Sequence, residues 1–223
     1  MVNAVQVGRY LKPLLARNAD LALVGRLLVV RPVRHVLCAV LIDRQSWAEA
    51  VTPTWFMCHV FGPYPKYFLN WGDQFWGRVW KTTDPDIAEA LCTEIEKTAL
   101  PKLRAITTIE EFLAAIPHTR GGHLLDIDPP TKSLMHLAMG EFDAARPLCQ
   151  RICGRLDPGP KEPDVTKAED AGAKKLCALL EKGNIAGIAH TLHAWEENNV
   201  KALKIAHLWE RTPFPVEDKF GLV

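Results

Sequence analysis

The sequence lacks most of the features that identify enzymes. It contains two serines, Ser46 and Ser133, and neither lies in the G-x-S-x-G turn that presents a hydrolase nucleophile. It also lacks the G-x-x-x-x-G-K-[ST] and G-x-G-x-x-G loops that bind phosphates. These absences argue against a serine hydrolase and against the usual nucleotide-dependent enzymes.

A strong excess of one charge and a long apolar run are also missing. The 27 Lys and Arg residues oppose 26 Asp and Glu residues, so the net charge is +1, which argues against a dedicated nucleic-acid binder. The longest apolar run, Val36 to Ile42, is far shorter than the roughly 20 residues that span a bilayer. The amino terminus lacks the apolar core and cleavage site of a secretory signal. We therefore expect a cytoplasmic protein without a membrane-spanning helix.

The composition is that of a globular protein, with 48% hydrophobic and 24% charged residues. Its length of 223 residues allows one sizeable domain or two small ones. The charges are uneven, because residues 1–80 hold nine Lys or Arg against four Asp or Glu, a net of +5, whereas the remainder hold 18 against 22, a net of −4. Twelve of the 18 aromatic residues also lie within residues 1–80. If the chain has a binding face, this part is the first place to look for it.

The first 80 residues predict a helix followed by a small sheet. Apolar residues at helical spacing favour an amphipathic helix over residues 4–17, although Pro13 lies inside it. Segments rich in β-branched and aromatic residues follow, separated by turn residues, and they predict strands. Short strands without a long helix between them predict an antiparallel meander. The predicted strands are 21–30, 33–43, 55–61 and 67–71.

The next segment predicts two helices and a loop. Asp84-Pro85-Asp86 is a favourable helix start, because it combines a capping side chain with proline and acid in the first turn. Thr107 and Glu110 have capping-box spacing, which predicts a second helix that ends before Pro117. Residues 118–130 are expected to form a connecting loop.

Beyond residue 130 the pattern is helical. Gly140 and Gly183 each interrupt an apolar helical pattern, and each is followed two positions later by an apolar residue that can pack back onto the ended helix. This part therefore predicts two helical hairpins. We expect an α+β fold, with an antiparallel meander sheet and helices in residues 1–117, the loop at 118–130 and an all-helical region at 131–223.

Four stretches in the first half carry a resemblance to known domains. The runs RPVRHVLCAVLIDRQ, VFGPYPKYF, LNWGD and ALPKLRAITTIEEFL together resemble a group of bacterial α+β domains of unknown function. This resemblance covers residues 25–116 and implies a fold and a bacterial origin, but no catalytic residue. Residues 131–210 resemble tetratricopeptide-like hairpins in their glycine and small-residue pattern. Their glycines lie 43 residues apart, which exceeds that family's period, so no binding residue is carried over.

The cysteines are scattered through a chain long enough to build its own core, which argues against a disulfide framework. We therefore expect mostly reduced, buried thiols. Cys149 and Cys153 lie one helical turn apart, and Cys177 can join them only through a tertiary contact. Without a C-x-x-C pair, structural cysteines are expected here. The six cysteines are Cys38, Cys58, Cys92, Cys149, Cys153 and Cys177.

The predicted loop HTRGGHLLDIDPP holds candidate acid–base residues, namely His118, His123, Asp126 and Asp128. Histidine with a carboxylate is a common combination in acid–base catalysis, and loops often carry functional residues. The alternative is a connector in which the aspartates and glycines form turns. Residue types alone do not choose between the two interpretations.

A metal site is a further candidate, because His190, His193 and Glu197 share one face of a predicted helix. Their spacing is not H-E-x-x-H, and the sequence identifies no fourth ligand. The alternative is a solvated helical face. We expect no metal and no other cofactor.

Basic and aromatic residues on or beside the predicted strands form the remaining candidate site. Arginine and tryptophan are enriched at interface hot spots, so such a group can bind an anion or a protein. Single-stranded nucleic acid is a less favoured ligand of the same surface. In the alternative interpretation the aromatics fill the core between sheet and helices, and the arginines pair with the acidic carboxy-terminal part of the chain. The candidate residues are Arg31, Arg34, His35, Arg44, Trp55, Tyr64 and Trp71.

The sequence thus favours a non-catalytic protein-binding module that binds another protein or a second copy of itself. An immunity or toxin-neutralising role is one concrete form of this expectation, by analogy with small bacterial domains. The alternative is a small-molecule sensor or enzyme with a pocket between sheet and helices, using residues 118–128.

Overall fold

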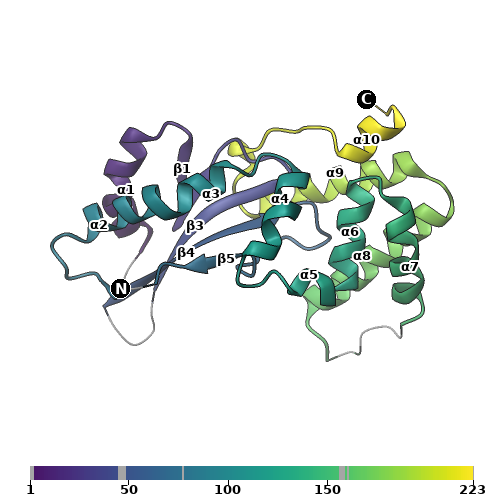
Figure 1. The fold of residues 1–223 in the computed structure, drawn as a ribbon, viewed down its shortest axis with the longest axis horizontal. Helices are drawn as coiled ribbons and strands as arrows, with labels where there is room; N and C mark the ends of the chain where they lie inside the picture. Colours follow the sequence, from purple (N-terminus) through teal and green to yellow (C-terminus); the bar gives the residue numbers. More distant parts are fainter. Residues whose placement is uncertain (1–2, 45–48, 77, 156–158, 160, 223) are drawn as a thin grey trace. The chain divides into compact units, whose positions relative to one another are not determined.

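A computed structural model of the protein describes residues 3–44, 49–76, 78–155, 159 and 161–222, and these form two compact units (Figure 1). The chain changes unit between Gly122 and His123, inside the expected connector. Two short segments cross over between the units. Residues 59–66 belong to the second unit, although the residues on either side belong to the first, and residues 207–210 belong to the first unit, although their neighbours belong to the second. The first unit is Met1–Cys58, Tyr67–Gly122 and His207–Glu210, and the second is His59–Lys66, His123–Ala206 and Arg211–Val223.

The fold is α+β, and the first unit contains the predicted antiparallel meander. Its strands are β1 (Leu21–Val24), β2 (Leu27–Val30), β3 (Val36–Arg44), β4 (Ala50–His59), β5 (Gly72–Gln74) and β6 (Trp80–Lys81). They run in the order β1-β2-β3-β4-β5, and β6 pairs with β4. The register places Leu28 opposite Val40 and Trp55 opposite Asp73.

Two of the strand predictions were wrong. Residues 21–30 form two strands, because Gly25 adopts a left-handed φ of 64° and turns the chain between β1 and β2. Residues 67–71 form no strand, and β5 begins only at Gly72. A β-carbon at Gly72 would lie 2.0 Å from the carbonyl oxygen of Trp55, so β5 can approach β4 this closely only with glycine.

The first helix, α1, has the bounds predicted for residues 4–17. It buries Val7, Leu11 and Leu14, although Pro13 lies within it. The capping box predicted at Thr107 and Glu110 is shifted by one residue, because Thr108 and Glu111 form it. In the ribbon, α1 and α2 lie together and α3 lies along β3 (Figure 1). The helical segments are α1 (Ala4–Arg17), α2 (Ile87–Glu94), the π-helical η1 (Ile95–Ala99), α3 (Leu100–Arg104), α4 (Ile109–Ala115) and η2 (Ile116–His118).

The segment 207–210 adds backbone hydrogen bonds beside β3. The amide of Val33 donates to the carbonyl of Leu208 at 2.8 Å, and the amide of Glu210 donates to the carbonyl of Val33 at 2.8 Å. Because buried backbone groups need hydrogen-bonding partners, this pairing fixes a distant part of the chain in the first unit.

The second unit is a group of packed helices, as predicted. Gly140 and Gly183 have left-handed φ values of 66° and 64° and end helices α6 and α8 where the sequence predicted breaks. The expected loop 118–130 is partly helical, since η2, α5 and the start of α6 lie within it. The helices are α5 (Leu124–Ile127), α6 (Pro129–Ala138), α7 (Phe142–Cys153), α8 (Asp164–Glu181), α9 (Ile185–Ala202) and α10 (Pro215–Phe220), and η3 (Ala206–Leu208) enters the first unit at its second residue.

A buried asparagine holds the segment 59–66 in the second unit. The side-chain amide of Asn199 on α9 donates to the carbonyls of Val60 and Gly62, both at 2.8 Å. Next to these bonds, the ring of Phe61 packs edge-on against Phe214 with centroids 5.2 Å apart. A polar clamp and an aromatic contact therefore fix this segment together.

The expectation of reduced thiols was wrong for one pair. Cys149 on α7 and Cys177 on α8 form a disulfide, because the two helices bring their α-carbons to 5.3 Å. The remaining described cysteines are free, and Cys153 is the exposed one. Burial raises the pKa of Cys38 to about 12, which keeps this thiol protonated and inert.

Candidate functional site

The candidate catalytic residues are divided between the two units. His118 belongs to η2 of the first unit, whereas His123 belongs to the second, and both are exposed. Asp126 forms an ion pair with Lys132 at 2.7 Å, which holds the pKa of its carboxyl below the ordinary value. Asp128 is the residue at which α5 ends and α6 begins. These contacts are those of a helical connection, which was the alternative interpretation.

The candidate metal ligands are each engaged otherwise or exposed. Glu197 pairs with Lys201 at 2.5 Å, and Nε2 of His193 lies 2.7 Å from a carboxylate oxygen of Glu217 on α10. His190 is exposed on α9. Within the described part of the chain, no group of three or more His, Cys, Asp or Glu residues is arranged to hold a metal ion.

The predicted binding aromatics lie mostly inside the protein. Trp55 and Trp71 are only 8% and 5% exposed, and His35 is also buried. Trp71 packs edge-on against Phe112 at 5.2 Å. Tyr64 is exposed but belongs to the second unit. The two tryptophans therefore do not form an exposed face.

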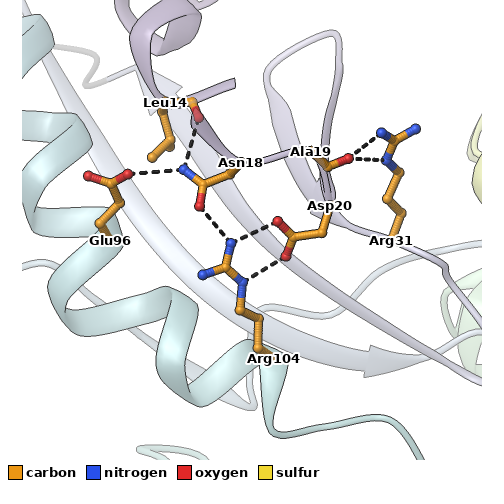
Figure 2. Close-up of polar contacts among 7 residues, drawn as sticks. All are labelled: Leu14, Asn18, Ala19, Asp20, Arg31, Glu96 and Arg104. Carbon is orange, nitrogen blue, oxygen red and sulfur yellow. Dashed lines mark hydrogen bonds and ion pairs between the residues drawn. The ribbon is translucent and has the colours of Figure 1, made fainter. Parts of the chain in front are cut away.

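The predicted binding arginines have structural contacts. The guanidinium of Arg31 donates to the carbonyl of Ala19 (Figure 2), and Arg34 lies 3.4 Å from Glu210 in an ion pair. The side chain of Arg44 lies outside the described part of the structure. The alternative, in which the arginines pair with the acidic carboxy-terminal part, therefore describes Arg34 but not Arg31.

Figure 2 also shows a polar network around Arg104. The guanidinium of Arg104 donates to both carboxylate oxygens of Asp20, at 2.7 and 2.8 Å, and to the side-chain oxygen of Asn18. Asn18 in turn donates to Glu96 and to the last turn of α1. The network joins the end of α1 to η1 and α3. The ion pair between Asp20 and Arg104 lowers the pKa of the Asp20 carboxyl.

An open groove in the first unit is the best candidate site, and the sequence did not single it out. Its volume is about 530 Å³, within the range of ligand-binding sites. One wall is the segment that leads into β6, and the other is α2. The lining residues are Trp76, Arg78, Trp80, Asp86, Glu89, Ala90, Thr93 and Glu94.

The groove is organised around Arg78. Its guanidinium forms ion pairs with Asp84 at 3.2 Å and Asp86 at 2.9 Å, and it lies 5.2 Å from the ring centroid of Trp80. The pairing lowers the pKa of Asp86. It also explains why α2 begins only at Ile87, without the predicted side-chain cap, since both aspartates bind the arginine instead.

Two exposed apolar side chains belong to the wall that leads into β6, namely Trp76, which lines the groove, and Val79, which lies between two lining residues in the sequence. Trp76 is 64% exposed and Val79 is 55% exposed. The indole N–H of Trp76 donates to Asp73 at 2.8 Å, and the guanidinium of Arg120 lies 5.6 Å from its ring centroid. These contacts orient the indole although most of its surface stays in water.

The lining supports binding better than catalysis. One arginine and three carboxylates give it a formal charge of −2, and it contains no histidine or cysteine. An acidic lining repels phosphate, so it also argues against nucleic acid as the ligand of this groove. The signal for it in the sequence was local, namely two tryptophans with an arginine between them, followed by an acidic helix start.

The charge asymmetry along the sequence does not follow the two units. The first unit holds 13 Lys or Arg against 12 Asp or Glu, and the second holds 14 of each. Each unit is therefore nearly neutral, and any charge complementarity with a partner has to come from a local patch such as the groove lining.

No family model, curated protein or solved structure matches this chain. The two resemblances in the sequence therefore remain predictions. None of the described helices is both long and apolar enough to cross a membrane.

Proposed function

We propose that this protein is a non-catalytic protein-binding module and that the groove beside Trp76 is its contact surface. The observation that carries the proposal is the exposure of Trp76, at 64%, next to Val79 and the groove. A tryptophan costs free energy when it stays in water, and it is among the strongest hot-spot residues when a partner covers it.

The observations support a protein partner better than a small molecule. Small-molecule sites are mostly apolar and enclosed, whereas this groove is open and lined by charged groups. An exposed aromatic beside charged groups is typical of a protein interface. An immunity or toxin-neutralising role is one form of the proposal, in which the partner is a toxin.

The test places a photo-crosslinking residue at Val79 in the full chain and identifies the trapped partner by mass spectrometry. The purified partner is then titrated against the wild type, Trp76→Ala and the matched control Ile127→Ala, which changes another exposed apolar residue on α5. We expect Trp76→Ala to weaken binding about tenfold or more, and Ile127→Ala to leave it unchanged.

Equal binding by Trp76→Ala would overturn the proposal. Crosslinking to a second copy of the chain would support it in its self-association form, provided that Trp76→Ala also shifts the dimer to monomer in sedimentation. A thermal shift with a small molecule that the Trp76→Ala variant loses would instead favour a sensor.

A further inference from the structure

We propose that the groove recognises a basic segment of the partner protein, with a ligand arginine or lysine held by Glu89 and Glu94 beside Trp76. This inference rests on the proposed function and names the chemistry of the partner.

The acidic wall forms one continuous stripe of α2 and its cap. Positions 86, 89, 90, 93 and 94 all line the groove, and these steps of three and four residues place them on one face of a helix. Ala90 lies in the middle of this stripe, and its small side chain leaves room between the flanking carboxylates. The helix thus offers acceptors at both ends of the stripe and space at its centre.

The intramolecular contacts of Arg78 show which groups hold a guanidinium beside this groove. Arg78 is held by two carboxylates and the face of Trp80, with its guanidinium 5.2 Å from the ring centroid. Planar guanidinium groups favour this combination of a carboxylate and an aromatic face. A second cation in the groove would meet the same kinds of group.

Glu89 and Glu94 remain for such a second cation. Arg78 pairs with Asp84 and Asp86, whereas the described residues form no ion pair within 4.0 Å with either glutamate, although Arg17 is near enough to interact with Glu89 electrostatically. Trp76, which stays 64% exposed even with Arg120 at its ring, supplies an aromatic face nearby. The net charge of −2 on the lining complements a basic ligand.

The experiment uses a fluorescein-labelled peptide of alternating arginine and glycine and a matched peptide in which citrulline, which is neutral and of similar shape, replaces arginine. Fluorescence anisotropy is measured with the full chain at low and high salt. We expect the arginine peptide to bind about fivefold or more tightly than the citrulline peptide, and to weaken as salt rises.

The Glu89→Gln/Glu94→Gln variant should weaken binding of the arginine peptide about fivefold or more. The control Glu110→Gln/Glu162→Gln changes the net charge equally at two exposed positions outside the groove, and should change binding less than about twofold. Equal losses in both variants would show general charge attraction and overturn the inference. No binding of the arginine peptide would also overturn it.

The two proposals fail differently. If the crosslinked partner loses affinity for Trp76→Ala but keeps it for Glu89→Gln/Glu94→Gln, the groove is the interface and the basic-segment inference is wrong. If the partner is indifferent to Trp76→Ala, the proposed function fails even where the arginine peptide binds.

Discussion

Replacing Asn199 by alanine should destabilise the second unit more than most single changes. Asn199 is 4% exposed, and its side-chain amide donates hydrogen bonds of 2.8 Å to the carbonyls of Val60 and Gly62. These carbonyls belong to the segment 59–66, and both residues are buried. In Asn199→Ala both acceptors lose their donor without gaining water.

The size of the effect follows from these two bonds. A buried polar group left without its partner costs about 1–3 kcal/mol, so two carbonyls predict a loss of about 2–6 kcal/mol. This is a large part of the total stability of a typical domain, which is about 5–15 kcal/mol. Asn199→Asp should cost at least as much, because its carboxylate would face two carbonyl oxygens with no hydrogen to donate.

Asn198 provides the matched control, since it is the same residue type on the same helix but exposed. Asn198→Ala should change stability by no more than about 0.5 kcal/mol. The measurement is urea unfolding followed by circular dichroism, with hydrogen exchange at the amides of residues 59–66. If Asn199→Ala and Asn198→Ala unfold at the same urea concentration, the clamp contributes nothing and the reasoning is refuted.

Two further predictions concern the same unit. The disulfide joins Cys149 and Cys177, which are 28 positions apart in the sequence, and so restricts the unfolded chain. Reducing it should therefore lower the free energy of unfolding by roughly 3–4 kcal/mol. A melting temperature unchanged by reductant would contradict this. Burial lowers the pKa of His193, but the nearby carboxylates of Glu196, 3.8 Å from Nδ1, and Glu217, hydrogen-bonded to Nε2 at 2.7 Å, outweigh it and raise the pKa above its ordinary 6.5. The stability contributed by protonated His193 is therefore complete below about pH 6.5 and is lost as the pH rises through the pKa of the folded state. In thermal unfolding, the higher stability of the wild type relative to His193→Gln should shrink toward about pH 8.5. A difference that does not change with pH would exclude this role.

The features that the sequence predicts correctly depend on local chemistry. Gly140 and Gly183 end helices because the left-handed conformation strains residues with a β-carbon, and this holds wherever the helices pack. The helix over residues 4–17 follows in the same way from its apolar stripe. The shift of the predicted capping box from Thr107 to Thr108 is small, because both threonines are competent caps.

The features that the sequence misses depend on tertiary contacts. The Cys149–Cys177 bond needs α7 and α8 to pack side by side, which neither cysteine signals alone. The assignment of residues 59–66 to the second unit needs Asn199, which lies more than a hundred residues away in the chain. Helix periodicity does not report which distant backbone a buried amide will contact.

The candidate site was missed for a related reason. Composition marks the tryptophans as one group, but Trp55 is 8% exposed and Trp76 is 64% exposed. Trp55 lies in the interior of β4, where both neighbouring strands and a helix can cover it, whereas Trp76 follows the short strand β5. Because strand length and pairing decide burial, an aromatic just beyond a short strand is a better candidate for binding than one inside a long strand. The acidic face of α2 meets Trp76 only in the folded protein, because the two walls of the groove lie apart in the sequence.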